Sequence, residues 1–206
     1  MAIDVEATTR DRLLLAAEEL FATQGIDAPS LAEITQAAGS GNTGAVHYHF
    51  GGREELLAAI VDEHRTELDA RREALLDELE ASGEVTPDGL VRCLIGPMID
   101  LLDDERGRAY LSIAAQRALW PKQAPPSPRP VVVRLLHLEG RPGGRAPVAG
   151  LLAELGFLTA TSALAQRARL EAIDGRDAGI GRAAFAEELL AAIVRIVAVP
   201  TGEDHP

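Results

Sequence analysis

The sequence predicts an all-α fold, in which three short N-terminal helices precede a larger helical domain. Apolar residues make up 47% of the 206 residues, whereas aromatic residues make up only 3%. Ala and Leu dominate the apolar set, which favours helices, because strands prefer β-branched and aromatic side chains. Apolar positions recur at helical spacing, and no segment shows the alternation that is typical of a strand. We therefore expect helices packed on helices around a sizeable core.

The first predicted helix begins with a capping signal at Thr8. Thr8 and Asp11 have the spacing of an N-cap residue and the third helical residue, which is that of a capping box. Gly25 is expected to end the helix in a left-handed cap. Residues of its buried face recur at helical spacing: Leu13, Ala17, Leu20 and Phe21.

Two shorter helices are predicted between Leu31 and Phe50, joined by a glycine-rich turn. Ser30 with Glu33 forms a second capping box, and Gly39 ends the helix that it opens. Asn42 or Thr43 is expected to cap the next helix. That helix is short, aromatic and histidine-bearing, and its Val46 and Phe50 are expected to point inward. This layout is typical of a helix-turn-helix, whose second helix enters a DNA major groove.

The remainder of the chain is predicted to form longer helices. Gly51-Gly52 breaks the chain, and a long helix follows from Arg53 to about Glu80. Further helices are expected at 90–103, 106–120, 148–173 and 182–199, with a linker at 82–89 and a proline-rich loop at 121–147 that holds one short helix, 131–138. Pro97 is expected to kink the first of these helices. The inner face of the long helix is expected to carry Leu57, Ile60, His64, Leu68 and Leu75. We place the domain boundary between residues 52 and 53, giving domains 1–52 and 53–206.

Charge and composition limit the classes of partner. The net charge is −12, so any DNA binding must come from a local surface and not from bulk attraction. Residues 1–66 alone carry a net charge of −7, which is the strongest argument against DNA binding. The single cysteine fits a reducing compartment. The N-terminus lacks an apolar signal core, and the longest apolar run is too short for a bilayer, so we expect a cytoplasmic protein with no membrane partner.

At its N-terminal end the chain resembles the TetR family of transcriptional regulators. The resemblance covers about Thr9 to Ile60 and is carried by Leu13-Leu14, Ala16-Ala17, Leu20-Phe21, Gly25, Ser30-Leu31, Ile34, Ala38-Gly39, Gly44, Val46, His49-Phe50, Arg53 and Leu56-Leu57. It implies an all-helical homodimer in which three N-terminal helices bind DNA and the last two helices form the dimer interface. The chain departs from the family in a turn one residue longer, in His47 where tyrosine is usual, and in Arg53 where lysine is usual.

Geometry and the resemblance together give the expected DNA contacts. Thr43, Gly44 and His47 are expected to meet base edges, because they lie in the N-terminal part of the third helix. The residues expected to hold phosphates are Ser30, Tyr48, His49 and Arg53, and Asn42 is expected to serve either role.

The resemblance also implies interface and effector residues in the second domain. The last two helices are apolar nearly all round, so a second surface must cover them. The candidate dimer contacts are Leu151, Leu155, Leu158, Leu164, Phe185, Leu189, Ile193 and Ile196. The candidate contacts to an effector are His64, Met98, Arg117, Trp120 and Phe157.

Other readings of the same residues are weaker. Residues 39–44 match G-x-G-x-x-G, but a helix and not a strand precedes them, so a nucleotide site is not expected. His47 and His49 are two apart and do not share a helix face, so no metal site is expected. Cys93 is expected to be a small buried residue and not a redox sensor. No nucleophile elbow, zinc spacing or phosphate loop is present, so we expect neither enzyme chemistry nor a cofactor.

The sequence therefore predicts a DNA-binding transcriptional regulator, specifically a repressor. As a homodimer it would bind a palindromic operator, and a small, largely apolar effector would release it. One alternative is a helical ligand-binding or scaffold protein that has lost DNA binding, and a weaker one is a cofactor-free enzyme in a helical cavity.

Overall fold

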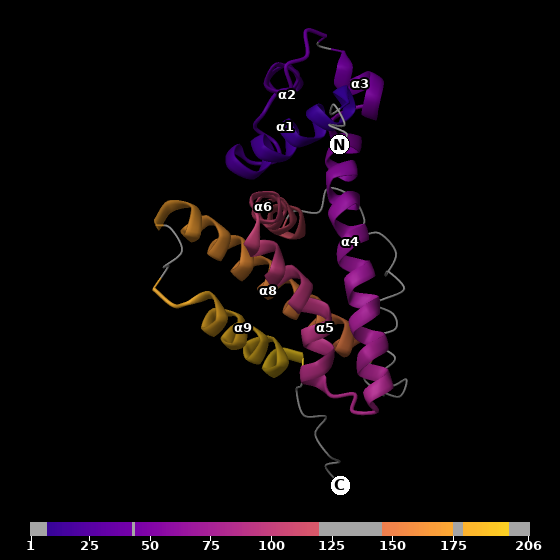
Figure 1. Ribbon diagram of the computed structural model, residues 1–206, viewed down its shortest axis with the longest axis vertical. Coiled ribbons are helices and arrows are strands. Elements are labelled where there is room, and N and C mark those ends of the chain that lie inside the picture. Colours follow the sequence, from indigo (N-terminus) through magenta and orange to yellow (C-terminus); the bar gives the residue numbers. More distant parts are fainter. Residues whose placement is uncertain (1–7, 43, 120–145, 175–178, 198–206) are drawn as a thin grey trace, which may run out of the picture.

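The computed structural model describes residues 8–42, 44–119, 146–174 and 179–197, and every element within them is helical, as expected. The N-terminal domain holds three helices, α1 (Thr9–Gln24), α2 (Leu31–Ala37) and α3 (Ala45–Phe50). The rest of the molecule is built from α4 (Arg53–Ser82), α5 (Pro87–Asp100), the 3-10 helix η1 (Leu101–Asp103), α6 (Glu105–Leu119), α8 (Ala146–Asp174) and α9 (Arg182–Val197). Figure 1 shows α4 running nearly the length of the molecule, from the N-terminal domain to its opposite end.

Both predicted capping boxes are present. The Thr8 hydroxyl accepts a hydrogen bond from the Asp11 N–H at 3.2 Å, and the Asp11 carboxylate accepts one from the Thr8 N–H. Ser30 and Glu33 make the equivalent pair at the start of α2. Gly25 ends α1 with a φ of 100°, which glycine adopts without the steric cost of a Cβ, but its ψ of 154° differs from the predicted left-handed cap. Local hydrogen bonds thus fix the ends of the helices that precede α3.

The inner face of α4 differs from the prediction at its C-terminal end. The stripe through Leu57, Ile60, His64 and Leu68 is buried, but it continues through Arg72 and Leu76. Leu76 is fully buried, whereas Leu75 is 37% exposed. The expected Leu75 position was therefore wrong by one residue, because steps of four from Leu68 lead to Leu76 through Arg72, whose guanidinium donates to the Leu94 carbonyl.

Helix α5 begins earlier than predicted, and the linker before it is correspondingly shorter. Thr86 is its N-cap, accepting a hydrogen bond from the Gly89 N–H, and Pro87 occupies the first helical position. Proline suits that position because its missing N–H has no partner there in any helix. The predicted helix over 90–103 also ends sooner, at Asp100, and continues as η1.

One hydrophobic core connects the two ends of the molecule. It includes Phe21 and Val46 from the N-terminal domain, Leu111 from α6 and Leu164 from α8. In Figure 1, α6 lies between α1 and α8, and it packs against both of them. The N-terminal domain therefore rests on α4 and α6 together. The predicted short helix 131–138 and most of the proline-rich loop lie outside the described residues, and no described helix is long and apolar enough to cross a membrane.

Candidate functional site

Helix α3 divides its side chains sharply between the core and the solvent. Val46 is fully buried, whereas the neighbouring Tyr48 is 84% exposed and His47 is also exposed. His49 is half-buried, and its ring meets the Tyr48 ring edge-on, with centroids 5.0 Å apart. An aromatic side chain that is 84% exposed buries little surface in the fold, so this face of α3 is available to a partner.

The turn before α3 is organised by Asn42. Its side-chain oxygen accepts a hydrogen bond from the Gly44 N–H at 2.9 Å, one residue before the helix begins. Gly44 is the N-cap residue, and no side chain caps α3 directly. Asn42 therefore orders the turn without being the helix cap that the sequence suggested. Thr43, the other predicted cap and a predicted base contact, lies outside the described residues.

His47 is held by a hydrogen bond to the end of its own helix. Its Nδ1 lies 3.0 Å from the Gly51 carbonyl oxygen. Because a carbonyl only accepts, Nδ1 carries the proton, and Nε2 of the neutral ring is left as an acceptor. The exposed imidazole is thus fixed in one tautomer. Ser30, the predicted phosphate contact on α2, is exposed and already accepts the Glu33 N–H through its hydroxyl oxygen.

The structure places Arg53 differently from the expected phosphate contact. Its guanidinium donates to the Ile26 carbonyl at 3.0 Å and to the Pro29 carbonyl, and it lies over the Phe21 ring. These bonds tie the start of α4 to the segment between α1 and α2. Arginine serves this purpose because its rigid fork satisfies two carbonyls at once. The side chain is committed to the fold of the N-terminal domain.

Arg10 is a basic residue at this surface that the sequence reasoning missed. It lies on α1 and is exposed, with its guanidinium carbon 4.9 Å from the centre of the Phe50 ring of α3. The contact brings a positive charge from the first helix onto the third. Sequence spacing gave no signal for it, because the two residues are forty positions apart and meet only in the folded domain.

Several acids of the N-terminal region are already occupied. Hydrogen bonds from the Thr8 side chain and backbone hold the pKa of Asp11 below its ordinary value, and bonds from the Ser30 backbone and side chain do the same for Glu33. Asp62 pairs with Arg65 at 3.8 Å. The bonds to Asp11 and Glu33 come from neutral groups and keep both carboxylates ionised, so the net charge of residues 1–66 stays at −7, a sum that already includes Arg65.

The buried acid Glu18 joins the two domains. It lies on α1, is 2% exposed, and its Oε1 is 2.5 Å from Nε2 of His64 on α4. Its Oε2 accepts a hydrogen bond from Arg106 Nε on α6 at 2.8 Å, and Arg106 also binds Glu63. A second link comes from Gln116 of α6, whose side-chain oxygen accepts the Ile26 N–H at 3.0 Å. Sequence reasoning placed His64 among effector contacts and did not find Glu18 or Gln116.

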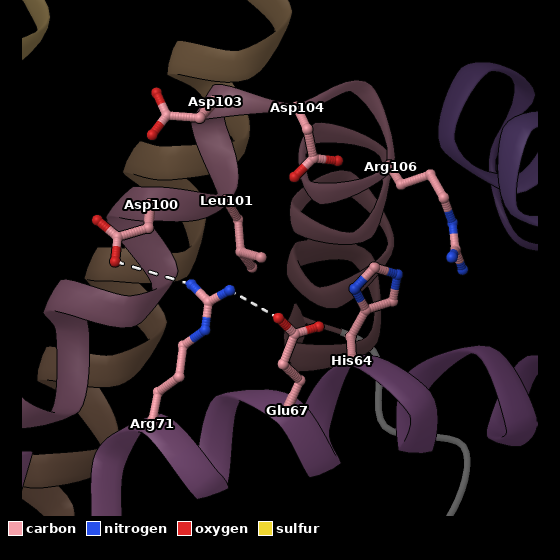
Figure 2. A pocket seen from close by; sticks show the side chains of 8 residues that line it. All are labelled: His64, Glu67, Arg71, Asp100, Leu101, Asp103, Asp104 and Arg106. Carbon is pink, nitrogen blue, oxygen red and sulfur yellow. Dashed lines mark hydrogen bonds and ion pairs between the residues drawn. The ribbon is translucent and has the colours of Figure 1, made fainter. Parts of the chain in front are cut away.

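The other predicted effector residues do not gather at one described site. Met98 is buried on α5, Arg117 is half-buried on α6, and Phe157 is 36% exposed on α8. Trp120 lies outside the described residues. Of the four predicted residues that the structure describes, His64 alone lines the polar cleft between α4, the end of α5, η1 and the start of α6 (Figure 2). Cys93 is 6% exposed, and burial together with the nearby Glu78 raises the pKa of its thiol, as expected of a packed cysteine.

The predicted dimer contacts fall into two groups. Leu164, Leu189 and Ile193 are buried within the subunit, and the interior faces of α8 and α9 account for them. Their burial corrects the expectation that a second copy would reach these three side chains. The others with a described side chain are exposed or half-buried: Leu155, Leu158, Phe185 and Ile196. The side chain of Leu151 lies outside the description.

Comparison with known proteins identifies the N-terminal domain. Residues 13–60, which contain α2, α3 and the turn between them, match the family described as bacterial regulatory proteins, tetR family. The N-terminal domain of this chain belongs to the TetR family. Members of this family are non-enzymatic regulators, in agreement with the expectation drawn from the sequence.

Two curated relatives illustrate how far the similarity extends. The chain is 34% identical over 88 residues to the HTH-type transcriptional regulator TtgR of Pseudomonas putida, which covers 42% of this chain and 39% of TtgR. It is 41% identical over 63 residues to the HTH-type transcriptional regulator SrpR of Pseudomonas putida, covering 30% of this chain and 29% of SrpR. The chain thus spans well under half the length of these two relatives.

Solved structures extend the likeness to the whole fold. The probable transcriptional regulatory protein RHA5900 superposes with a TM-score of 0.53 at 20% identity, over 93% of this chain and 100% of that one. AmtR of Mycobacterium smegmatis superposes with a TM-score of 0.52 at 18% identity, over 98% of this chain and 92% of that one. At these identities the likeness shows a shared fold alone.

Proposed function

We propose that this TetR-family protein is a DNA-binding transcriptional repressor, which acts in the cytoplasm as a homodimer on a palindromic operator. The observation that carries the proposal is the outward face of α3, where His47 and the 84% exposed Tyr48 stand in solvent while Val46 anchors the helix. A recognition helix needs this division, because its outer side chains must reach bases in the major groove.

The side chains suggest distinct roles at the groove. Gly44, which has no side chain, and Asn42 and His47 are suited to base edges, the last through the acceptor Nε2 that its bond to Gly51 leaves open. Tyr48, His49 and Ser30 offer polar hydrogens to phosphate oxygens. Arg10 replaces Arg53 as the proposed cationic contact, because the Arg53 guanidinium is occupied by backbone carbonyls.

A homodimer would place two copies of α3 on one face of DNA. Two-fold symmetry matches a palindromic site whose halves lie about 34–36 Å apart, or a multiple of that distance. The exposed apolar side chains Leu155 and Phe157 on α8 support an interface that a second copy covers. A small effector that prefers one spacing of the two recognition helices by about 1.4 kcal/mol would shift the equilibrium tenfold.

The proposal is tested by footprinting and by equilibrium binding to DNA from the gene's own upstream region. His47→Ala and Tyr48→Ala are compared with Val85→Ala, which alters an exposed apolar residue in the turn between α4 and α5. We expect two-fold symmetric protection by the wild-type protein and the Val85 variant. We expect each α3 variant to lose about tenfold or more in affinity, while thermal unfolding remains unchanged.

A folded protein that shows no sequence preference at low salt would overturn the proposal. That result would favour the alternative of a helical ligand-binding protein without DNA binding, for which the net charge of −7 over residues 1–66 is the supporting observation.

A further inference from the structure

A polar cleft opens where α4 meets the corner between α5 and α6. It has a volume of about 460 Å³. Its lining includes four carboxylates, from Glu67, Asp100, Asp103 and Asp104, together with His64, Arg71, Leu101 and Arg106. Figure 2 shows the side chains of Arg71, Glu67 and His64 rising from α4 toward the acids of the corner. The cleft is acidic, which contrasts with the apolar effector site expected from the sequence.

His64 contributes a buried acceptor to this cleft. The side chain is 9% exposed, and its ring is stacked on Tyr110, with centroids 4.5 Å apart. Nε2 faces the Glu18 carboxylate and therefore carries a proton, which leaves Nδ1 as the ring nitrogen that accepts a hydrogen bond in this tautomer. Figure 2 shows the His64 ring beside the Glu67 side chain, with Asp104 above them at the corner. Among the described residues no donor is bonded to this nitrogen.

The cleft also carries an uncompensated negative charge. Arg106 is engaged by Glu18 and Glu63 outside the cleft, and Asp103 is engaged by Arg182. Three carboxylates then remain against one guanidinium, because Arg71 lies 2.6 Å from Glu67 and 3.9 Å from Asp100. The remaining net charge is −2. Asp104 keeps one oxygen for the Gly107 N–H at the start of α6 and has the other free.

We propose that this cleft binds a small aliphatic amine in its protonated form, with an ammonium group held by His64 Nδ1 and Asp104. An ammonium group carries a positive charge and several hydrogen-bond donors. It therefore complements a site whose groups are an imidazole acceptor and carboxylates. A diamine matches the charge of −2, with its second ammonium group near Glu67. The binding is independent of DNA, but the role of this amine as the effector rests on the proposed function.

The position of the cleft connects it to the N-terminal domain. The same imidazole that would accept a hydrogen bond from the amine holds Glu18 of α1 through its other nitrogen, and Arg106 lines the cleft while binding the same carboxylate. A donor at Nδ1 makes Nε2–H a stronger donor, because polarisation passes through a hydrogen-bonded chain. A bound amine would thus change the hydrogen bonds of Glu18, which hold α1 against α4 and α6.

Calorimetric titration of the full chain with 1,4-diaminobutane tests the site, and 1,4-butanediol serves as a neutral probe of similar shape. We expect saturable one-to-one binding of the diamine and none of the diol. In the protein labelled with ¹⁵N-histidine, the His64 Nδ1 resonance is expected to move on addition of the diamine alone. This readout reports on the site directly and requires no DNA.

Asp104→Asn and Glu67→Gln are the informative variants, and Asp62→Asn is the control. Asparagine at 104 still accepts the Gly107 N–H, so helix α6 keeps its cap while the cleft loses a charge. Asp62 lies on the same helix as Glu67, outside the cleft, with its side chain 71% exposed. We expect about tenfold weaker binding in each cleft variant and a change of less than about twofold in the control.

Absence of diamine binding, equal loss in all three variants, or an unmoved Nδ1 resonance would each overturn the inference. Operator binding is measured on the same preparation. A protein that binds DNA but not the diamine refutes the amine site alone, whereas one that binds the diamine but no DNA refutes the proposed function alone.

Discussion

Arg92 and Arg106 are two arginines of equal exposure whose partners differ. Their side chains are 45% and 44% exposed. Arg92 binds Asp88 and Glu187, which are both more than half exposed, so water replaces it readily. Arg106 binds Glu18, which is 2% exposed. Breaking an ion pair costs most when one of its members stays buried and cannot be solvated, and here that member is Glu18.

Arg106→Ala is therefore expected to cost more than Arg92→Ala. Removing Arg106 leaves a buried carboxylate with His64 as its remaining partner, which should lower the free energy of unfolding by about 1–3 kcal/mol. Removing Arg92 should change it by about 1 kcal/mol or less. Urea denaturation at pH 7 measures both. Equal losses in the two variants would show that the Glu18 cluster does not bear on stability.

At the scale of elements, the corner between η1 and α6 depends on a close backbone approach. A Cβ at Gly107 would collide with the backbone of Leu101, including its carbonyl oxygen. The same corner carries Asp103 and Asp104 of the acidic cleft. Glycine here lets the chain turn tightly enough to bring those acids over α4.

Gly107→Ala is expected to be strongly destabilising, by more than about 2 kcal/mol, because the backbone itself must move. Gly96→Ala is the matched control, since it lies inside α5 with open space around the added methyl group. Alanine there should stabilise the protein by about 0.5–1 kcal/mol, as alanine favours helix interiors. Thermal and urea unfolding compare the two. Destabilisation of the Gly96 variant by as much would contradict the close approach as the cause.

Local signals made some elements predictable and left others hidden. The capping boxes at Thr8 and Ser30 were confirmed because each depends on residues three positions apart. Burial of the polar residues Glu18 and Arg72 was missed, because a charged residue on an apolar stripe is buried only when another helix supplies a partner. That information belongs to the tertiary structure.

The candidate site shows the same division. Exposure of Tyr48 and burial of Val46 follow from helical spacing. The roles of Arg10 and Arg53 do not, because one depends on a ring of α3 and the other on carbonyls between α1 and α2. The fold therefore makes Arg10, and not Arg53, the candidate cationic contact to DNA.

At the scale of the whole molecule, a second ion network joins α8, α9 and η1. Glu171 accepts hydrogen bonds at 2.6 Å from both Arg167 and Arg182, and Arg182 also binds Asp103. Burial opposes ionisation of Glu171, but the hydrogen bonds from Arg182 and Arg167 outweigh it and hold its pKa below the ordinary value of 4.5. The network thus requires the ionised carboxylate.

The sign of the pH dependence follows from that lowered pKa. Stabilisation by Glu171 is complete above pH 4.5 and is lost as the pH falls through the lower pKa of the folded state. Glu171→Gln is expected to lower the free energy of unfolding by about 3 kcal/mol at pH 7, because it removes the carboxylate that pairs with the buried Arg167 at 2.6 Å. The difference from wild type should shrink below pH 4.5. A constant difference from pH 7 to pH 3 would contradict this linkage.

The charge of the whole molecule determines how DNA binding should depend on salt. The chain carries a net charge of −12, and of the cations within residues 8–66, Arg53 is bound to carbonyls while Arg65 pairs with Asp62. Arg10 and Arg12 remain, and of these two Arg10 lies against α3, whereas Arg12 binds Thr9 on its own helix. Few phosphate contacts release few counterions, so the slope of log K against log salt should be shallow.

Arg10→Ala should reduce the magnitude of that slope by about 1, which is the change expected for one lost phosphate contact. Arg12→Ala is the matched control, because residues two apart on α1 point to different faces and Arg12 binds Thr9 instead of meeting α3. Equilibrium binding to one operator over a salt series measures both slopes. A steep slope of log K against log salt in the wild type would indicate many phosphate contacts. If Arg10→Ala left that slope unchanged, the DNA would have to bind another surface of the molecule.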